Sequence, residues 1–309
     1  MTFIHPALRP LLEASKQLPA LSDSPVEAVR NAAEQRARSR PRGPEIENVQ
    51  DVTVKGRDEH DIPVRVYRPH DSLGVVIALH GGAWMLGSIN TFDDVARHLA
   101  NDSGCTVVSV NYRLAPEHPF PAALDDVWDV TRWVATNAEL LGPTPHRLMI
   151  MGESAGANLA AVTALKARDA GGPAFRLQAL VYPSVDARLQ GESMERYRDG
   201  YLLTKNDMAY ALSTYGVGTK ARADQWEISP LLAPSHQGVA PALIVSAQCD
   251  PLCSEAASYA QVLTEANVPA VHVVYTGVTH LFFGMRDALE ASKQAQQQVA
   301  LALRNAAIN

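Results

Sequence analysis

Short apolar runs rich in β-branched residues alternate with longer amphipathic stretches from Val49 to the end of the chain. Runs of this length and composition are typical of strands, and the longer stretches have the apolar spacing of helices. Eight strands are expected, over Val49–Val54, Ile62–Arg68, Val75–Leu79, Thr106–Val110, Arg147–Met151, Leu177–Tyr182, Ala242–Ala247 and Val271–Tyr275. This alternation predicts an α/β fold with a mostly parallel sheet flanked by helices.

The helices expected around these strands span Thr91–Asn101, Ala122–Ala138, Ala155–Arg168, Ser254–Ala266 and Met285–Arg304. Only the polar turn Lys55–Asp58 separates the first two strands, which leaves no room for a crossover helix. We therefore expect these two strands to pair antiparallel at the edge of the sheet.

Two regions fall outside the alternation. Residues 1–45 contain helical patterns around Pro6–Gln17 and Pro25–Arg38, and residues from about 187 to 230 interpose polar and helical sequence between the sixth and seventh strands. A mobile tail and a surface loop would be one interpretation. We favour a helical cap, because a structureless insertion of this size is improbable inside a compact domain. The main domain then comprises residues 46–186 and 231–309.

Composition limits the kind of partner and the location. The 309 residues are 47% hydrophobic and 19% charged, which is enough to bury one large core. The formal net charge of −6 and the scattered Lys and Arg residues argue against a nucleic-acid partner. No signal peptide is evident in Met1–Leu18, and no segment has the ~20 consecutive apolar residues of a membrane span, so a cytoplasmic location is expected.

The three cysteines, Cys105, Cys249 and Cys253, are too few for a disulfide framework. A metal or redox pair at Cys249 and Cys253 would need further ligands that the sequence does not supply. We expect buried thiols and no metal site.

Ser154 is the candidate nucleophile. It is the centre of Gly152-Glu153-Ser154-Ala155-Gly156, after an expected strand and before an expected helix. Flanking glycines allow the sharp strand-to-helix turn that holds such a serine at the carboxyl end of a sheet. The helix that follows directs its free N–H groups, with that of Ala155 nearest, at negative charge that develops on a substrate.

A serine hydroxyl needs a general base, and the base needs an acid that orients it. His280 lies just beyond the last expected strand, and Asp250 just beyond the strand before it. The three residues follow one another along the chain in the order Ser, Asp, His. This is the order in serine hydrolases whose nucleophile lies on a turn between a strand and a helix. Ser154, Asp250 and His280 are therefore the expected catalytic residues.

The loop after the third strand, His80-Gly81-Gly82-Ala83-Trp84, is expected to complete an oxyanion hole. Two adjacent glycines let backbone N–H groups approach a substrate oxygen closely. We assign the N–H groups of Gly81, Gly82 and Ala155 to this role. Trp84 is expected either to line the substrate pocket or to pack against the cap, and both alternatives stay open.

With these residues, the chain resembles the hormone-sensitive-lipase-like esterases, the bacterial family IV of the α/β-hydrolase superfamily. The resemblance extends from about Val49 to the C-terminus. It rests on the motifs His80–Trp84, Tyr112-Arg113-Leu114-Ala115-Pro116-Glu117 with the following His118–Ala122, Gly152–Gly156, Asp250-Pro251-Leu252 and His280.

The resemblance implies a carboxylesterase that hydrolyses short to medium acyl esters through an acyl-enzyme, with no cofactor. It also implies a structural role for His80, and a homodimer that can form through the last strand and helix, around Val271–Arg304. Residues 1–45 and 187–230 match the position of the family's cap. Tyr112, Arg113 and Glu117 are expected to build a rigid loop rather than to act directly.

The chain departs from the family pattern at four positions. Ala83 replaces a glycine and is expected to narrow the acyl side of the site. Glu153 replaces an aspartate, Ala157 replaces a glycine, and Leu281 follows His280 where glycine is common.

Two rival functions are an amidase or formamidase with the same triad, and a non-catalytic ligand receptor on this fold. The presence of His280 favours an enzyme over the receptor. Kinetic assays on an ester and on its matching amide would distinguish an esterase from an amidase.

Overall fold

The computed structural model describes residues 2–142 and 147–309. Met1, the first residue of the expected cap, and residues 143–146 of the expected main domain lie outside the described residues. One eight-stranded sheet has the order β1-β2-β4-β3-β5-β6-β7-β8. Its strands are β1 Asn48–Lys55, β2 Asp61–Arg68, β3 Val75–Leu79, β4 Thr106–Val110, β5 Leu148–Glu153, β6 Phe175–Val181, β7 Ala242–Cys249 and β8 Ala270–Thr279. All eight expected strands are confirmed, with ends that differ by a few residues.

The sheet is antiparallel at one edge and parallel elsewhere. β1 pairs antiparallel with β2, and β2 pairs antiparallel with β4. The pairs from β4 through β3, β5, β6 and β7 to β8 are parallel. The antiparallel edge expected from the short turn at Lys55–Asp58 is confirmed.

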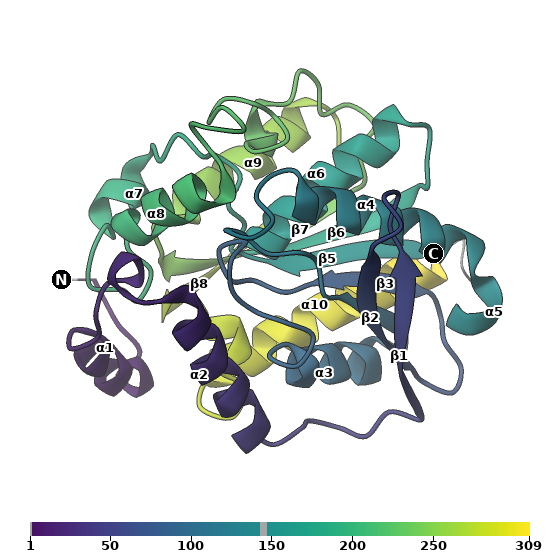
Figure 1. Cartoon of the computed structure of the whole chain (residues 1–309), viewed down its shortest axis with the longest axis horizontal. Coiled ribbons are helices and arrows are strands. Elements are labelled where there is room, and N and C mark those ends of the chain that lie inside the picture. Colours follow the sequence, from purple (N-terminus) through teal and green to yellow (C-terminus); the bar gives the residue numbers. More distant parts are fainter. Residues whose placement is uncertain (1, 143–146) are drawn as a thin grey trace.

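Helices cover both faces of the sheet, as Figure 1 shows. One face carries α4 Ala122–Thr136, α6 Ala155–Asp169 and α9 Cys253–Glu265, and the other carries α3 Asp93–Ser103 and α10 Glu290–Ile308. All five residues of β3 are buried. Ile77 and Leu79 pack into one apolar cluster while Val76 and Ala78 pack into the other. This two-sided burial explains why β3 reads as an unbroken apolar run.

Each of the five expected helices differs from the structure at one end or both, and two of these differences have a local cause. The helix expected over Ala122–Ala138 breaks at Asn137, whose φ of −117° and ψ of 54° are not helical, and a short α5, Ala138–Leu141, follows. The helix expected from Met285 begins only at Glu290. Leu289 is extended there, after the 3₁₀ turn η4, Phe282–Gly284.

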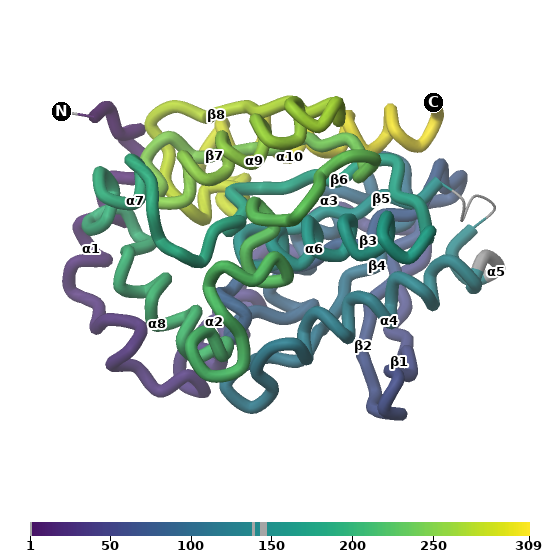
Figure 2. The backbone as a smooth tube through the Cα atoms, turned by 90° about the horizontal axis from the view of Figure 1, so that it is seen from above, coloured from purple at the N-terminus to yellow at the C-terminus, as the bar shows by residue number. Residues whose placement is uncertain are grey.

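Four further helices gather at one end of the molecule in both Figure 1 and Figure 2. They are α1 Arg9–Ser15 and α2 Val26–Ser39 from the N-terminal region, and α7 Glu192–Arg196 and α8 Lys205–Tyr215 from the segment between β6 and β7. Short 3₁₀ turns accompany them, at η1 Pro6–Leu8, η2 Leu21–Asp23 and η3 Pro230–Leu232. The two regions that fall outside the strand–helix alternation therefore meet in space.

In residues 2–142 and 147–309, no helix combines the length and the apolar character that crossing a bilayer requires.

Candidate active site

The turn between β5 and α6 holds Ser154 in a strained backbone conformation. Ser154 has φ 55° and ψ −119°, a region that non-glycine residues rarely occupy. Its N–H donates to the Val181 carbonyl at 2.9 Å. Gly156 lets α6 pass close to β3, because a Cβ at this position would lie 2.3 Å from the carbonyl oxygens of Leu79 and His80. The turn therefore projects Ser154 from the carboxyl end of β5.

Three side chains from three different loops meet in one hydrogen-bonded row. Ser154 Oγ lies 2.9 Å from His280 Nε2, and His280 Nδ1 lies 2.7 Å from Asp250 Oδ2. A carboxylate only accepts, so Nδ1 carries the proton and Nε2 presents its lone pair to the serine hydroxyl. The N–H of Leu252 donates to the other Asp250 oxygen at 2.9 Å and fixes the carboxylate. This arrangement can transfer the serine proton to the imidazole.

The three groups are shielded from bulk water. Ser154 is 7% exposed, His280 2% and Asp250 0%. Electrostatic interactions among them are consequently stronger than they would be at an open surface. The ring of Tyr182 packs on His280 with centroids 4.4 Å apart, which limits the movement of the imidazole.

The loop after β3 has an unusual run of positive φ angles. Gly82 has φ +123°, and Ala83 and Trp84 have φ 56° and 57°. A Cβ on residue 82 would lie 2.2 Å from the Leu86 carbonyl oxygen, so only glycine fits there. No acceptor in the described part of the chain takes a hydrogen bond from the N–H of Gly82, Ala83 or Ala155. These donors are available to a bound anion or oxyanion.

Gly81 differs from the next two residues of the loop. Its N–H donates to Glu153 Oε1 at 3.4 Å and is already engaged with the protein. The assignment of Gly81 to the oxyanion hole stays a prediction, and the N–H groups of Gly82 and Ala83, which follow it in the loop, are the ones without an acceptor in the described residues. The sequence could not show this, because the direction of each N–H depends on the φ angles of the loop.

Glu153 and Tyr182 form a contact that the sequence did not identify. The Tyr182 hydroxyl donates to Glu153 Oε2 at 2.8 Å. Desolvation raises the pKa of the Glu153 carboxyl, against the hydrogen bonds from Tyr182 and Gly81, which lower it. Glu153 thus links the loop after β3 to the aromatic ring that covers His280. The only signal in the sequence was the replacement of aspartate by glutamate beside Ser154.

The His80 side chain supports the same loop from within. Because a carbonyl only accepts, His80 Nδ1 must donate its hydrogen to Gly81 O, at 2.7 Å. The Tyr112 hydroxyl donates to the His80 carbonyl at 2.7 Å, and the two rings stack with centroids 4.3 Å apart. Burial lowers the pKa of His80 to about 4, so the ring is neutral near pH 7.

Ion pairs attach the Tyr112–Ala122 segment to neighbouring helices of the protein. Arg113 forms an ion pair with the buried Asp126, with Nη2 and Oδ1 2.7 Å apart. Glu117 pairs with Arg30 of α2 at 2.8 Å between Oε1 and Nη1. These contacts fit a rigid loop that supports the site.

Trp84 packs against α8. Its side chain is 1% exposed and stacks on Tyr215, with ring centroids 4.8 Å apart and planes at 9°. Of the two roles considered for Trp84, packing against the expected cap is the one for which the structure provides a contact. Ala83 remains partly exposed beside it.

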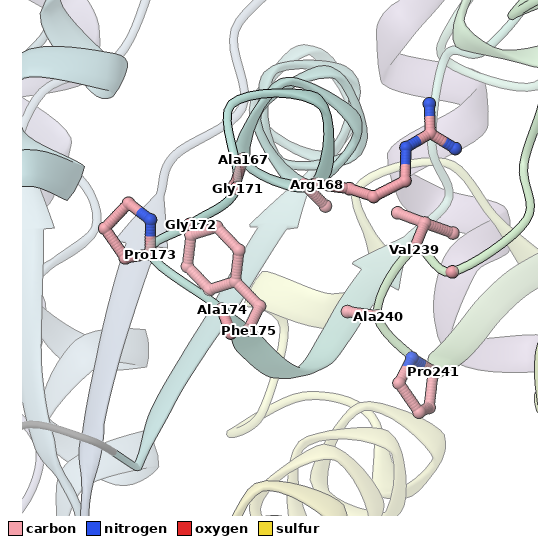
Figure 3. Close-up of a pocket in the computed structure, with 12 residues that line it drawn as sticks. Ala167, Arg168, Gly171, Gly172, Pro173, Ala174, Phe175, Val239, Ala240 and Pro241 are labelled. Atoms are coloured by element: carbon pink, nitrogen blue, oxygen red, sulfur yellow. The ribbon is translucent and has the colours of Figure 1, made fainter.

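A separate hollow of about 330 Å³ lies away from Ser154. Figure 3 shows its lining side chains, among them Arg168, Phe175 and Val239, around the end of α6 and the segments that lead into β6 and β7. These segments precede the strands, whereas Ser154, Asp250 and His280 follow strands at the opposite end of the sheet. Substrates of α/β folds bind at the carboxyl ends of the strands, so this hollow is not the candidate site.

Comparisons with known proteins agree with this fold. A family model described as alpha/beta hydrolase fold matches residues 76–284. The ethyl acetate hydrolase of Pseudomonas putida is 36% identical over 298 residues, which cover 94% of this chain and 93% of the relative. The carboxylesterase NlhH of Mycobacterium tuberculosis is 43% identical over 231 residues, 73% of this chain and 72% of the relative.

A solved structure with the same architecture is the hyperthermophilic esterase from the archaeon Pyrobaculum calidifontis. It is 39% identical, superimposes with a TM-score of 0.91 and is covered over 100% of both chains.

Proposed function

Because this chain belongs to the hormone-sensitive-lipase-like family of α/β hydrolases and is a carboxylic ester hydrolase, we propose that it cleaves short acyl esters through Ser154, His280 and Asp250. The observation that carries this proposal is the continuous row from Ser154 Oγ to His280 at 2.9 Å and from His280 to Asp250 at 2.7 Å. Each group has the partner that its role requires.

In the first half of the reaction, Ser154 Oγ attacks the ester carbonyl carbon while His280 Nε2 takes the hydroxyl proton. The carbonyl π electrons move onto the substrate oxygen. When they return, the bond to the alcohol oxygen breaks, and the alcohol leaves with the proton from His280. Asp250 holds the imidazole in place and stabilises its positive charge throughout.

In the second half, water gives a proton to His280 as its oxygen attacks the acyl carbon. The bond to Ser154 Oγ then breaks, and the serine recovers its proton from His280. The carboxylic acid is released and the enzyme returns to its starting state.

We assign the oxyanion hole to the N–H groups of Gly82, Ala83 and Ala155. Support comes from their lack of acceptors in the described residues and from the position of Ala155 at the N-terminus of α6. Backbone donors fixed before the reaction stabilise the developing negative charge without reorganising.

The preference for short acyl esters is supported by two observations. The Pseudomonas putida relative is named for ethyl acetate, a small ester. In this chain Ser154 is only 7% exposed, and Ala83 adds a methyl group to the loop beside it.

We also propose that residues 1–45 and 187–230 act as a cap over the site. Supporting contacts are the Trp84–Tyr215 stack and the Arg30–Glu117 ion pair, which join α8 and α2 to loops of the main domain.

The proposal is tested with Ser154→Ala, His280→Ala and Asp250→Ala on the p-nitrophenyl esters acetate, butyrate and palmitate. The expected loss of kcat is roughly 10⁶-fold for the first two variants and about 10⁴-fold for Asp250→Ala, because the acid orients the base without transferring the proton. The wild-type enzyme should prefer acetate and butyrate to palmitate.

Ser213→Ala and His70→Ala are the matched controls, because both side chains are exposed and lie outside the row. Turnover near the wild-type level in Ser154→Ala would refute the proposed mechanism. A preference for palmitate would remove the proposed substrate class.

A further inference from the structure

Helix α2 is attached to the main domain in an unusual way. None of its 14 residues is buried. A surface helix usually docks by burying an apolar stripe, which supplies most of its stability. What holds α2 must therefore be sought among its polar contacts.

Arg30 makes the densest set of these contacts. Its Nε donates to the Met85 carbonyl at 2.8 Å, and its Nη2 donates to the Ala115 carbonyl at 2.8 Å. The same guanidinium binds both oxygens of Glu117, at 2.8 and 2.9 Å. The Arg30 side chain is only 24% exposed, whereas Glu117 is 54% exposed. The two bonds to backbone carbonyls are thus the better shielded part of the contact.

Glu34 lies one helical turn further along α2 and forms hydrogen bonds with residues that follow Met85 in the loop after β3. Its carboxylate accepts from Ser88 Oγ in a short hydrogen bond, and from Asn90 Nδ2 at 3.2 Å. Residues i and i+4 share a helix face, so Arg30 and Glu34 present one polar surface to the loop that follows β3.

That loop needs external support. Gly82, Ala83 and Trp84 all have positive φ. For the two non-glycine residues this conformation costs on the order of 1–3 kcal/mol each, so it persists only where the surroundings hold it. The Met85 N–H donates to the Gly82 carbonyl at 3.0 Å and closes the turn. Among the described residues, Arg30 is the only hydrogen-bond donor to the Met85 carbonyl. Arg30 therefore fixes the residue that closes the turn bearing the free N–H groups.

We propose that Arg30 is a positioning residue for the oxyanion hole: through Met85 it holds the N–H groups of Gly82 and Ala83 in the orientation that stabilises the transition state. Helix α2 then supports the chemistry although Arg30 does not touch the substrate. This inference rests on the proposed function, because it requires the oxyanion assignment to Gly82 and Ala83.

The guanidinium fork is essential to the role. Three acceptor groups surround Arg30 on different sides, and only a planar group with several N–H donors reaches all of them. A lysine ammonium would keep the charge and reach fewer of the acceptors. A methionine would keep the length and remove every donor.

The test compares Arg30→Met and Arg30→Lys with Arg36→Met, a matched control on the same helix. Arg36 is exposed, and its side chain has no hydrogen bond or ion pair in the described residues. Each enzyme is assayed on p-nitrophenyl butyrate and on its thiono analogue, in which sulfur replaces the carbonyl oxygen. Sulfur accepts hydrogen bonds poorly, so a displaced oxyanion hole penalises the oxygen ester selectively.

We expect Arg30→Met to lower kcat on the oxygen ester by roughly 10- to 100-fold, with KM changed by less than about threefold, because small misplacements of donors have effects of this size. The loss on the thiono ester should be below about threefold. Arg30→Lys should lie between the wild type and Arg30→Met, and Arg36→Met should match the wild type.

Equal losses on both esters would overturn the inference, since a smaller folded fraction lowers both rates alike. A loss on the oxygen ester below about threefold would overturn it as well. If Arg30→Met does not fold, Arg30→Lys decides by the same ratio of losses. Activity in Ser154→Ala would refute the proposed function. An inactive Ser154→Ala, together with equal losses of kcat on the two esters in the Arg30 variants, would refute this inference alone.

Discussion

Asp250 and Glu255 are two buried carboxyl groups with different partners. Asp250 accepts from His280 and from the Leu252 N–H, so both of its oxygens are used. Glu255 Oε1 accepts hydrogen bonds from the N–H groups of Val185 and Asp186, at 2.7 and 3.2 Å. The buried Oε2 of Glu255 has no hydrogen-bond partner in the described residues. Burial raises the pKa of Glu255 well above its usual value. Burial therefore favours the neutral, protonated form of the Glu255 carboxyl over the carboxylate.

This pKa shift has a consequence for stability. The folded state holds the Glu255 proton at pH values where the unfolded chain, with a pKa near 4.5, has released it. The contribution of Glu255 to the free energy of unfolding is thus fully present below about pH 4.5 and is lost as pH rises through the raised folded pKa. The steepest slope that one proton can give is about 1.4 kcal/mol per pH unit.

We predict that Glu255→Gln, which is neutral at every pH, flattens this part of the pH dependence. Urea unfolding from pH 5 to 8 would measure the slope in the wild type and the variant. Glu47→Gln is the control, because the Glu47 side chain is exposed to solvent. An unchanged slope in Glu255→Gln would show that Glu255 is ionised in the native state.

At the residue level, the sequence singled out three side chains that the structure brings together: Ser154, Asp250 and His280. Each follows a strand, and parallel strands end at the same edge of a sheet, so their proximity could be predicted. The contact of the Gly81 N–H with Glu153 could not be predicted, because it depends on the particular φ angles of the loop.

At the scale of elements, strands were easier to predict than helix ends. β3 and β4 have the expected bounds because apolar runs stop abruptly at polar residues or glycine. The helix expected from Met285 begins later because Ser292 and Gln296 bind the Phe283 carbonyl, and this holds η4 as a separate turn before α10. Such contacts leave no periodic pattern in the sequence.

The stack of Tyr215 on Trp84 joins α8 to the loop after β3, and it gives an element-level prediction. Tyr215 is 1% exposed, and its hydroxyl has no hydrogen-bond partner in the described part of the chain. Tyr215→Ala should lower the free energy of unfolding by about 3–5 kcal/mol, as for other buried aromatic residues. Tyr215→Phe should be neutral or stabilising by up to about 1 kcal/mol, because it removes an unpaired buried hydroxyl.

Urea unfolding of the two Tyr215 variants would measure both values. A loss above about 1.5 kcal/mol in Tyr215→Phe would contradict the prediction, since it would mean that the hydroxyl has a bound partner.

Over the whole molecule, two regions far apart in sequence support different parts of the candidate site. Arg30 of α2 binds the loop after β3, while Ser193 of α7 donates to the Pro251 carbonyl at 2.6 Å, next to Asp250. The sequence placed both regions outside the main alternation. It could not pair them with particular loops, because single polar contacts over long separations have no local signature.

The class of enzyme was predictable because its motifs are local and lie at fixed places relative to strands. Esterase relatives over most of the chain confirm that class. The substrate was not predictable, because a hydrophobic pocket distinguishes one methylene by only ~1–3 kcal/mol and is built from contacts between distant segments.

The most direct test of the catalytic assignment is labelling with a fluorophosphonate, followed by peptide mass spectrometry and an activity assay on the same sample. We predict one label per chain, on Ser154, with activity lost in proportion to labelling, no labelling of Ser154→Ala and normal labelling of Ser213→Ala. Turnover that persists in fully labelled enzyme, or inactivation through a label on another residue, would contradict the assignment of Ser154 as the nucleophile.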